Sequence, residues 1–385
     1  MNIILSDFEE HTNFLPLSFT RSISDFRIGI TTIKEKWSLL GCENISVLTE
    51  KYLQKKYHLI VKNENIIVNA SIIPNLDLLS KISNLKNTVL KKDNIVIAYS
   101  CNKNLEIPEN IIYYEKEILQ IKKLTDIFSL NSICIEKDFE LLTKNRKSVK
   151  ISNTNVCFGK FPIFVEEGCF IECSTINAME GSVYIGKNCK IMEGSHIRGP
   201  FAICEDSELK MGTKIYTGTT IGPHCKIGGE VNNTVFFGFS NKAHDGFIGN
   251  SVVGEWCNFG AGSNTSNLKN NYANVKLWNY KTEKFEDTGL QFCGLIMGDH
   301  SKCGINTMFN TGTTVGVSSN IFGAGFPRNF IPSFSWGGYA GMKEFRLEAA
   351  FEVMEKVMAR RNMTLLEVER EIFQFIFSKS LSNSR

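Results

Sequence analysis

One apolar residue recurs at a spacing of six through most of the second half of the sequence. A fixed period this short predicts a solenoid, because six residues make one short strand plus a corner and no coil can bury its apolar side chain alone. Chance enrichment of isoleucine is the alternative, but sixteen positions keep phase in three runs. The positions are Ile185, Ile191, Ile197, Ile203, Leu209, Ile215, Ile221 and Ile227, then Phe247, Val253 and Phe259, then Met297, Cys303, Phe309, Val315 and Ile321.

Small side chains lie four residues after most of these apolar residues, as at Ser195, Thr219 and Cys225. A small side chain fits where the walls of a narrow prism converge, and glycine reaches corner conformations that other residues adopt only at a cost. Each strand would pair in parallel with the strand one coil along, about 4.8 Å away. The pattern therefore predicts a left-handed parallel β-helix of hexapeptide repeats, an exception to the usual right-handed crossover.

Composition limits the remaining possibilities. The chain has 385 residues, 43% hydrophobic content and a net charge of +3 with dispersed charges, so no nucleic-acid-binding stripe is expected. The start MNIILSDFEE lacks a basic region and a cleavage signal, which predicts a cytoplasmic protein, and no apolar run approaches a membrane span. The 12 cysteines form no CxxC pair, and Cys189, Cys225 and Cys303 occupy interior positions of the repeat, so we expect reduced core thiols.

Three domains are expected. Residues 1–150 alternate short β runs with helical patterns, which predicts a Rossmann-like α/β domain of the doubly wound type. Residues 151–330 form the β-helix and residues 331–385 a helical extension. The expected N-terminal strands are Ile3–Leu5, Ile45–Leu48, Ile66–Val68, Ile95–Ala98 and Ile111–Tyr114.

Four helices are expected outside the repeat. Two N-terminal ones lie near residues 30–40, with Gly41 as the stop, and near residues 76–85. In the C-terminal extension, Ala350 to Met358 form one apolar helical face, and Thr364 followed by Glu367 predicts a capping box that opens a second helix.

The period breaks at Glu230–Gly246 and again from about Asn264 to Gly294. A solenoid needs no insertions for its own stability, so we interpret both breaks as inserted loops on a working face. His244 lies in the first break, and Lys242 lies beside it.

The segments NKAHDGFIG and GEWCNFGAGSNTSNL resemble the acetyltransferase domain of the GlmU-like bifunctional enzymes that make UDP-N-acetylglucosamine for the cell envelope. The order of a nucleotidyltransferase domain followed by a left-handed β-helix is the same. Phe19-Thr20-Arg21, Arg27-Ile28-Gly29 and Glu35-Lys36-Trp37 are similar to the form of these enzymes typical of Bacteroidetes-like bacteria. The resemblance implies acetyl transfer from acetyl-CoA to glucosamine 1-phosphate, uridylyl transfer, and a homotrimer with acyl sites between neighbours.

By this resemblance, His244 is the base that removes the proton from the amine, and an imidazole with a pKa of about 6.5 suits that task. Backbone N–H groups at the coil corner would stabilise the oxyanion. The resemblance also implies residues that contact the two substrates. Those assigned to the sugar phosphate are Lys214, Asn232, Lys242, Phe247 and Asn258, and those assigned to acetyl-CoA are Ala261, Asn267, Ile305 and Gly323.

Several of these positions depart from the family pattern. Lys214 stands where the family has an arginine, Asn232 where it has a lysine, Phe247 where it has a tyrosine, and Ile305 where it has a serine. These departures bear on which sugar phosphate is bound. Lys242 is either a replacement for the missing phosphate-binding charge or a solvated loop residue.

The N-terminal domain departs further, because SDFEEHTNFLPLSFTR contains none of the glycines with which such enzymes cradle nucleotide phosphates. Thr20, Arg21, Arg27 and Lys36 are the candidate nucleotide-binding residues. Nucleotidyl transfer would use Mg²⁺, but the sequence identifies no metal site. Asp77 and Asp93 are ligand candidates only by residue type, and ordinary turn or helix roles explain them better.

Two alternatives belong to other classes. The first is a nucleotidyltransferase or nucleotide-sugar-binding protein whose β-helix serves only to form trimers, and the second is a β-helix without enzymatic activity. A zinc-dependent hydratase is disfavoured because the histidines lack clustered spacing. An ice-binding surface is disfavoured because only two Thr-Gly-Thr sequences occur in the repeat.

Overall fold

The computed structural model describes residues 2–382. They form two compact units. The first contains the residues up to Phe14, Thr20–Phe26 and Thr31–Lys123, and the second contains Leu15–Phe19, Arg27–Ile30 and the described residues from Leu124 onward. The main division falls after Lys123, ahead of the boundary at residue 150 that the change in sequence pattern predicts. Among the helices of the described residues, none is long and apolar enough to cross a membrane.

The first unit contains a six-stranded sheet in the order β2-β1-β3-β6-β5-β7. β1 pairs in parallel with β2 and β3, whereas β6 runs antiparallel to β3 and β5. All five expected strands are present, but the sheet is mixed and not purely parallel, and β5 was missed. The elements are β1 (Ile3–Ser6), η1 (His11–Phe14), η3 (Ile23–Asp25), α1 (Ile33–Leu39), β2 (Ile45–Leu48), β3 (Asn65–Asn69), β4 (Ile72–Ile73), α2 (Leu76–Ser83), β5 (Val89–Lys92), β6 (Ile95–Cys101), β7 (Ile111–Tyr113) and β8 (Leu119–Gln120).

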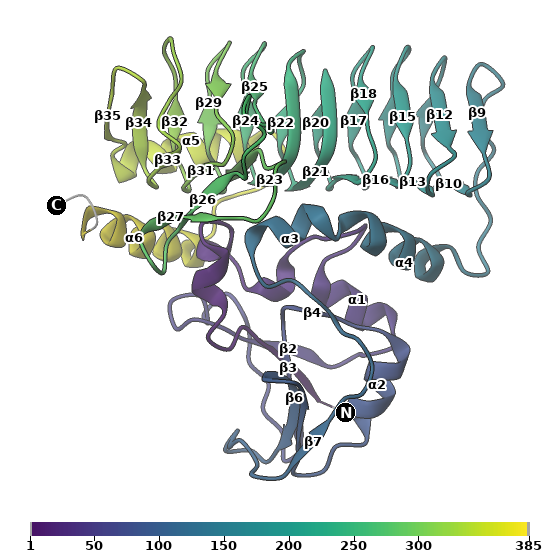
Figure 1. The fold of residues 1–385 in the computed structure, drawn as a ribbon, viewed down its shortest axis with the longest axis vertical. Coiled ribbons are helices and arrows are strands. Elements are labelled where there is room, and N and C mark those ends of the chain that lie inside the picture. The colour runs from purple at the N-terminus through teal and green to yellow at the C-terminus, as the bar shows by residue number, and fades with distance from the viewer. Residues whose placement is uncertain (1, 383–385) are drawn as a thin grey trace. The chain divides into compact units, whose positions relative to one another are not determined.

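The second unit is built on the expected left-handed parallel β-helix, whose coils stack side by side in Figure 1. Its three faces follow from the strand pairing. Face 1 contains β10 (Ile163–Val165), β13 (Val183–Ile185), β16 (Phe201–Ile203), β19 (Thr219–Ile221), the ends of β21 (Glu230–Gly238) and β23 (Phe247–Glu255), β28 (Leu295–Met297), β31 (Thr313–Val315) and β33 (Phe330–Ile331).

Face 2 contains nine parallel strands in the described chain, followed by one antiparallel strand. They are β11 (Phe170–Ile171), β14 (Lys190–Ile191), β17 (Glu208–Leu209), β20 (Lys226–Ile227), β22 (Asn241–Lys242), β24 (Asn258–Phe259), β29 (Lys302–Cys303), β32 (Asn320–Ile321), β34 (Ser335–Gly338) and the antiparallel β35 (Gly341–Glu344). Face 3 contains β9 (Val156–Gly159), β12 (Thr175–Ala178), β15 (His196–Arg198), β18 (Lys214–Ile215), the starts of β21 and β23, β25 (Asn264–Thr265) and β30 (Met308–Phe309).

The apolar positions of the repeat form one continuous core inside the coils. All eight residues from Ile185 to Ile227 are buried, as are Met297, Cys303, Phe309, Val315 and Ile321. The expectation for Phe247 is wrong by one residue, because Ile248 is the fully buried side chain that pairs with Val231 and Phe247 points outward.

The first break in the period is a shortened coil and not an inserted loop. Regular coils place paired residues eighteen positions apart, as at Leu209 and Ile227, but Ile227 pairs with Lys242 after only fifteen. The segment expected to be a loop therefore forms β21 and β22 of the solenoid. The missing residues shift the phase, which is why Ile248 replaces Phe247 in the core.

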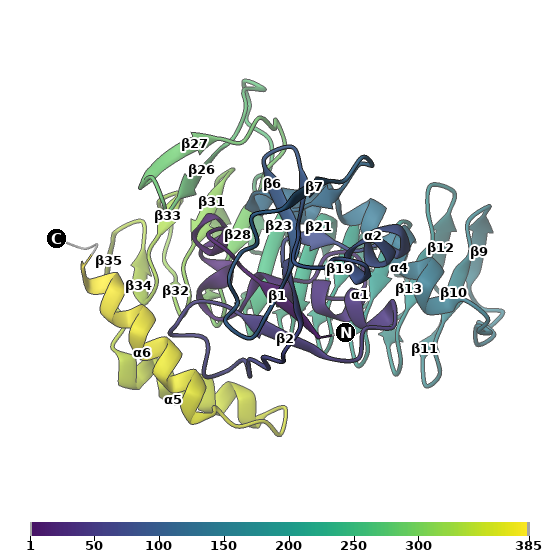
Figure 2. The ribbon, with the colours of Figure 1, turned by 90° about the horizontal axis from the view of Figure 1, so that it is seen from below.

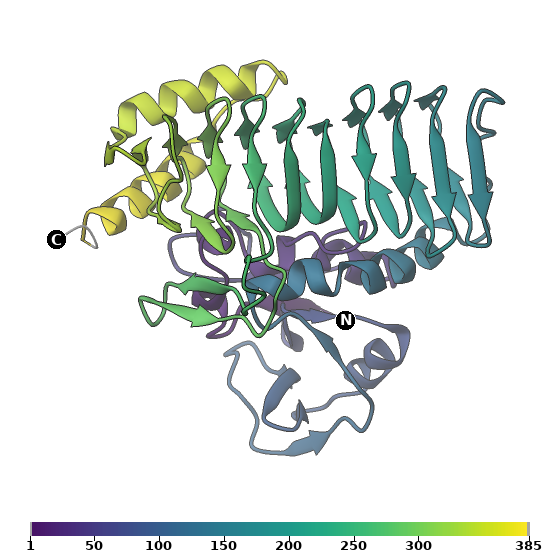
Figure 3. The ribbon, with the colours of Figure 1, turned by 45° about the horizontal axis from the view of Figure 1, so that its top comes forward.

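The second break is an insertion, as expected. Phe259 pairs with Cys303, and the chain between these two positions leaves the solenoid to form the antiparallel hairpin β26 (Lys276–Asn279) and β27 (Lys284–Asp287). Figure 3 shows this hairpin projecting from the coils. Trp278 stacks on Phe330 with ring centroids 4.2 Å apart, which fixes the hairpin to face 1.

Four helices pack within the second unit, together with η2 (Leu17–Phe19). α3 (Leu124–Ser129) and α4 (Asn131–Thr143) contact face 1 at β16, β19, β21 and β23, and Phe139 of α4 lies in a cluster with Phe164 and Tyr184. α5 (Leu347–Ala359) and α6 (Glu367–Ser382) lie together at the late coils (Figure 2). The expected Thr364–Glu367 capping box is absent, because the Leu366 N–H donates to the Glu369 carboxylate instead.

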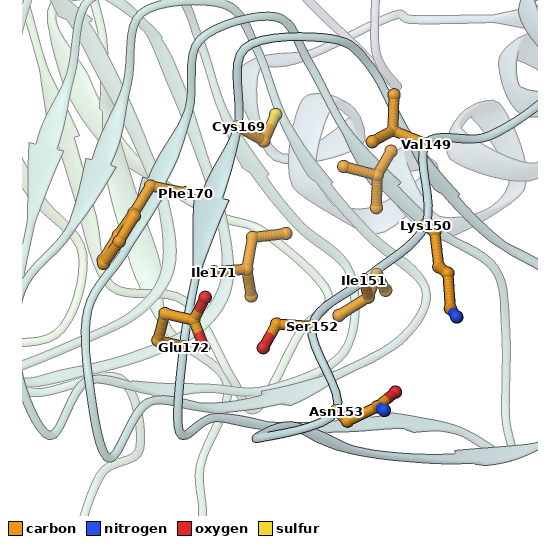
Figure 4. A pocket seen from close by; sticks show the side chains of 10 residues that line it. Val149, Lys150, Ile151, Ser152, Asn153, Cys169, Phe170, Ile171 and Glu172 are labelled. Atoms are coloured by element: carbon orange, nitrogen blue, oxygen red, sulfur yellow. The ribbon is translucent and has the colours of Figure 1, made fainter.

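A cavity of about 360 Å³ marks the N-terminal end of the solenoid. The segment Val149–Asn153 passes beside Cys169–Glu172 of the first full coil, and Ile151 and Ile171 point toward one another in the interior (Figure 4). Ile151 packs against the solenoid core, so this segment covers the end of the apolar interior that would otherwise face water.

Candidate active site on the β-helix

The edge between faces 2 and 3 carries four of the predicted residues. His244 follows β22, Ala261 follows β24, Ile305 follows β29 and Gly323 follows β32, so each occupies the same corner on a successive coil. Hydrogen bonds link these corners: the Gly262 N–H donates to the carbonyl of Asp245 (3.0 Å), and the Asn306 N–H to that of Ala261 (2.7 Å). We call this line of corners the 2–3 edge.

The later part of the 2–3 edge is open to an extended ligand. The Ile305 side chain is 71% exposed. Gly323 has a φ of 102°, and a Cβ added at this position would meet no atom within 4 Å, so the backbone there is uncovered. An apolar side chain and bare backbone suit the methylene chain of an acyl carrier, although Ile305 cannot donate a hydrogen bond from its side chain.

Face 3 beside this edge brings together the other predicted polar residues. Lys214 pairs with Glu230, which pairs with Phe247, so these residues lie side by side on three neighbouring strands. On the same strands Asn232 pairs with Gly249. The Asn267 amide donates to the Asn250 side chain at 2.8 Å, which holds the start of the insertion against β23. The structure therefore gathers residues that are up to fifty positions apart in the sequence.

His244 itself lies at the corner between β22 and β23, with its side chain exposed. It lines an open cavity of about 420 Å³ together with Lys210, Met211, Gly229 and Asp245. Lys210 is paired with Glu208 at 2.5 Å, so its charge is largely compensated. The imidazole is therefore available to a ligand that approaches the corner from solvent.

Lys242 occupies a place that neither sequence interpretation anticipated. Its side chain is 2% exposed and lies at the interior position where the adjoining coil has Ile227. The ammonium group donates to the carbonyl oxygens of Gly228 (3.0 Å) and His244 (2.7 Å). Burial lowers the pKa of Lys242 to about 8. Lys242 is thus neither a solvated loop residue nor exposed to a phosphate, and it holds the backbone of His244.

Asn258 is separated from His244 within one chain. It projects from face 2, where it pairs with Asn241 and Lys302. It lines a second cavity, of about 370 Å³, beneath the C-terminal end of α5. Asn258 and His244 therefore face different surfaces of the same solenoid.

The second cavity contains functional candidates that the sequence reasoning missed. Lys226, Lys302, Arg360 and Arg361 supply four cationic groups to its wall. A signal was present in the repeat, because the residue directly before each interior residue of face 2 points outward. That column reads Lys190, Glu208, Lys226, Asn241, Asn258, Lys302 and Asn320.

The candidate nucleotide-binding residues of the N-terminal region are all buried. Arg27 belongs to the second unit, where its Nε donates to the Phe237 carbonyl (3.1 Å) and its guanidinium also bonds to the Ile30 carbonyl (2.5 Å). The Lys36 ammonium donates to the backbone and hydroxyl oxygens of Thr31. Thr20 and Arg21 are at most 5% exposed. Arg27 and Lys36 therefore both donate hydrogen bonds to backbone carbonyl oxygens.

Asp7 organises the glycine-free loop that follows β1. Its carboxylate accepts hydrogen bonds from the Ser22 hydroxyl (2.7 Å), the Ile23 N–H (2.9 Å) and the Thr49 hydroxyl (2.5 Å), and it faces the His11 ring at 3.2 Å. These contacts tie Ser22 and Ile23 to the carboxyl end of β1. The loop that would cradle phosphates in a glycine-rich enzyme is here tied to a buried carboxylate.

A preformed Mg²⁺ site does not emerge from the residues present. Among residues 2–382, no group of three His, Cys, Asp or Glu side chains is arranged to hold a metal ion. Asp77 accepts a hydrogen bond from Tyr114 (2.6 Å) and pairs with Lys116, and Asp93 lies in the β5–β6 turn with a φ of 50°. Both have the ordinary structural roles that the sequence favoured.

The class of the N-terminal part follows from its sequence. Residues 3–147 match the model of the sugar nucleotidyl transferase family. This match covers less than half of the chain and does not include the β-helix.

Particular relatives include bifunctional enzymes. The chain is 31% identical over 165 residues to the bifunctional sugar-1-phosphate nucleotidylyltransferase/acetyltransferase of Sulfurisphaera tokodaii, covering 38% of this chain and 41% of that one. It is 36% identical over 87 residues to the bifunctional protein GlmU of Methanocaldococcus jannaschii, covering 23% and 21%. The chain thus spans less than half the length of these relatives.

Among solved structures, the chain is similar to the UDP-N-acetylglucosamine acyltransferase of Arabidopsis. The sequence identity is 16%, the TM-score is 0.30, and the match covers 55% of this chain and 77% of that one. A likeness this distant carries no argument about function.

Proposed function

We propose that the protein is an acetyl-CoA-dependent N-acetyltransferase acting on a sugar phosphate, with glucosamine 1-phosphate as the expected acceptor. The observation that supports this most is the 2–3 edge, where an exposed imidazole and an uncovered acyl-carrier path lie on consecutive coils. The name of the Sulfurisphaera relative includes an acetyltransferase, which agrees with this assignment.

The proposed reaction needs one base and one electrophile. The His244 imidazole accepts a proton from the sugar amine as the nitrogen attacks the thioester carbonyl carbon, forming the C–N bond. The C–S bond then breaks, and the departing thiolate takes up a proton from the imidazolium. Backbone N–H groups of the coil corners would stabilise the oxyanion formed between these steps.

Acceptor binding is proposed for face 3. Lys214 supplies one positive charge, while Asn232 and Asn267 supply neutral amides and Phe247 an apolar ring. A single lysine binds a phosphate as a point charge without the bidentate geometry of an arginine. Weak binding at face 3 alone is therefore expected, and a neighbouring chain is a source of further contacts.

A homotrimer is proposed as the functional assembly, with each acyl site between neighbouring solenoids. The open form of the His244 cavity and the placement of Asn258 on another face support this proposal, since two chains could bring the two residues together. Light scattering on the eluted protein tests it. A mass three times the 43.4 kDa of one chain is expected, and a monomer that acetylates at full rate would overturn it.

Sugar-1-phosphate nucleotidyl transfer is proposed as a second activity, with UTP as the expected nucleotide. The family match over residues 3–147 supports it. Release of pyrophosphate from UTP and N-acetylglucosamine 1-phosphate in the presence of Mg²⁺ tests this activity. No release, combined with acetyl transfer, would leave the N-terminal unit without a nucleotidyl role and the first proposal intact.

The acetyltransferase proposal is tested by acetyl-CoA consumption with three acceptors: glucosamine 1-phosphate, glucosamine 6-phosphate and glucosamine. Free thiol release that requires the 1-phosphate is the expected result. Consumption with none of the three would overturn the proposed acceptor class.

A further inference from the structure

The lining of the cavity beneath the end of α5 contains four cationic side chains and no carboxylate. Its polar lining consists of Lys226, Lys302, Arg360 and Arg361 with the amides of Asn241 and Asn258, and its volume is about 370 Å³. Cavities of this size hold small organic ligands. We call it the α5 pocket.

The repeat itself creates one wall of the α5 pocket. Lys226, Asn241, Asn258 and Lys302 each precede an interior residue of face 2, and strand pairing places them on four consecutive rungs. Rungs lie about 4.8 Å apart, so these four side chains form a polar column about 14 Å long. Arg360 and Arg361 approach the same column from the end of α5.

The charges of the pocket lack matching carboxylates. Lys226 is 3.5 Å from Glu208, which Lys210 also contacts at 2.5 Å. Within the described residues, no ion pair is formed by Lys302, Arg360 or Arg361. Arg361 donates one N–H group to the His224 carbonyl (3.1 Å) and approaches the Asn241 amide oxygen (3.4 Å), which leaves its other N–H groups uncommitted.

Among these groups, Lys302 gives the strongest indication of a bound anion. It is partly buried, and its ammonium donates to a neutral acceptor, the His300 carbonyl, at 2.9 Å. Burial lowers its pKa to about 8. A partly desolvated ammonium without a counter-charge is costly, and a bound anion would reduce that cost by pairing with it.

Aromatic rings form another part of the pocket wall. Phe239 stacks on Trp256 with ring centroids 4.3 Å apart, and both line the cavity. Trp256 is only 6% exposed, so the surface it offers is fixed by packing. Cations beside a rigid aromatic surface suit a ligand that joins an anionic group to a ring.

We propose that the α5 pocket binds a phosphate monoester of a small ring compound, a sugar or a nucleoside. Lys302, Arg360 and Arg361 bind the phosphate oxygens, Asn241 and Asn258 donate to the ring substituents, and the Phe239–Trp256 pair packs against the ring. Within one chain His244 lies outside this pocket, so ligand binding here can be measured separately from acetyl transfer.

Isothermal titration calorimetry on the full chain tests this proposal, with UMP, glucose 1-phosphate and inorganic phosphate as ligands. A monoester is expected to bind more tightly than inorganic phosphate, and the stronger of the two monoesters identifies the ring. Arg360→Met and Lys302→Met are each expected to weaken binding by about tenfold or more, since a hydrogen bond to a charged group contributes about 1.5–3 kcal/mol. Arg360 is exposed, so that variant should fold normally.

Two control variants make the result specific. Lys190→Met removes an exposed lysine two rungs before Lys226 on the same face, and His244→Ala removes the proposed base. Both should bind the monoester as the wild type does. Binding near pH 8 should also take up protons in the wild type and less in Lys302→Met, because the phosphate restores the lysine charge.

Three results would overturn the proposal. They are binding of none of the ligands, equal loss in Lys190→Met and Arg360→Met, or unchanged binding in both pocket variants. If His244→Ala abolished binding while the pocket variants retained it, the ligand would belong to the proposed acyl site instead.

Discussion

The ammonium group of Lys242 donates a hydrogen bond of 2.7 Å to the carbonyl oxygen of His244 from inside the β-helix. A second bond, to the Gly228 carbonyl, fixes the same ammonium to the preceding coil. The exposed corner that carries the proposed base is thus held by a charge in the core. This arrangement explains how a corner in a shortened coil keeps a defined position.

Lys242→Met should change how stability depends on pH. Burial lowers the folded-state pKa of Lys242 to about 8, below its ordinary value of 10.5. Between these values the unfolded chain binds more protons than the folded one, so the wild type gains stability as pH rises. Between pH 8 and pH 10.5, the free energy of unfolding of the wild type should rise by about 3 kcal/mol relative to that of the variant. Below pH 8 the difference between the two proteins should be constant.

Urea denaturation of the two proteins at several pH values measures this difference. Lys302 titrates in the same range, but it is present in both proteins and its contribution cancels. Lys190→Met changes an exposed lysine of the same face, and its free energy of unfolding should depend on pH in the same way as that of the wild type. A Lys242→Met curve parallel to the wild type would show that the ammonium is not desolvated.

The interior residues should dominate the stability of the solenoid. Ile221 is fully buried, so Ile221→Ala should cost about 2–5 kcal/mol through lost burial and the cavity left behind. Met211 is 71% exposed, and Met211→Ala should change stability by no more than about 0.5 kcal/mol. Chemical denaturation measures both, and similar costs for the two variants would contradict the assignment of the core.

Asp7→Ala should loosen the loop that follows β1. Three donors lose their acceptor, and each buried donor left unpaired costs about 1–3 kcal/mol. Hydrogen exchange of residues 20–25 should accelerate strongly, whereas Glu9→Ala, which removes a nearby exposed carboxylate, should leave it unchanged. Unaltered exchange in Asp7→Ala would mean that the carboxylate does not organise the loop.

Most of the solenoid was predictable because its signal is periodic. One side chain per six residues must enter the core. The burial of the repeat positions from Ile185 to Ile227 and from Met297 to Ile321 could therefore be predicted from the sequence. Phe247 was misassigned because the period alone does not say whether a break adds residues or removes them. Strand pairings such as that of Ile227 with Lys242 show that residues were removed.

The position of Lys242 could not be read from residue type, because lysine at a core position contradicts the hydrophobic pattern that defines the core. The surroundings of Arg27 could not be read from the sequence for a related reason. A positive charge within a family-like segment suggests phosphate binding, but only tertiary structure shows that its guanidinium serves backbone carbonyls such as that of Phe237. Arg360 and Arg361 lie more than a hundred residues from Lys226 and Asn241, so sequence proximity gave no indication of the α5 pocket.

The central claim is that His244 is the base of an acetyl transfer. The most direct test measures acetyl-CoA consumption with glucosamine 1-phosphate in the wild type, in His244→Ala and in His196→Ala, where His196 is an exposed histidine of β15. The rate should fall by about 10²–10⁴-fold in His244→Ala and stay unchanged in His196→Ala. A His244→Ala protein that retains the wild-type rate would contradict the claim.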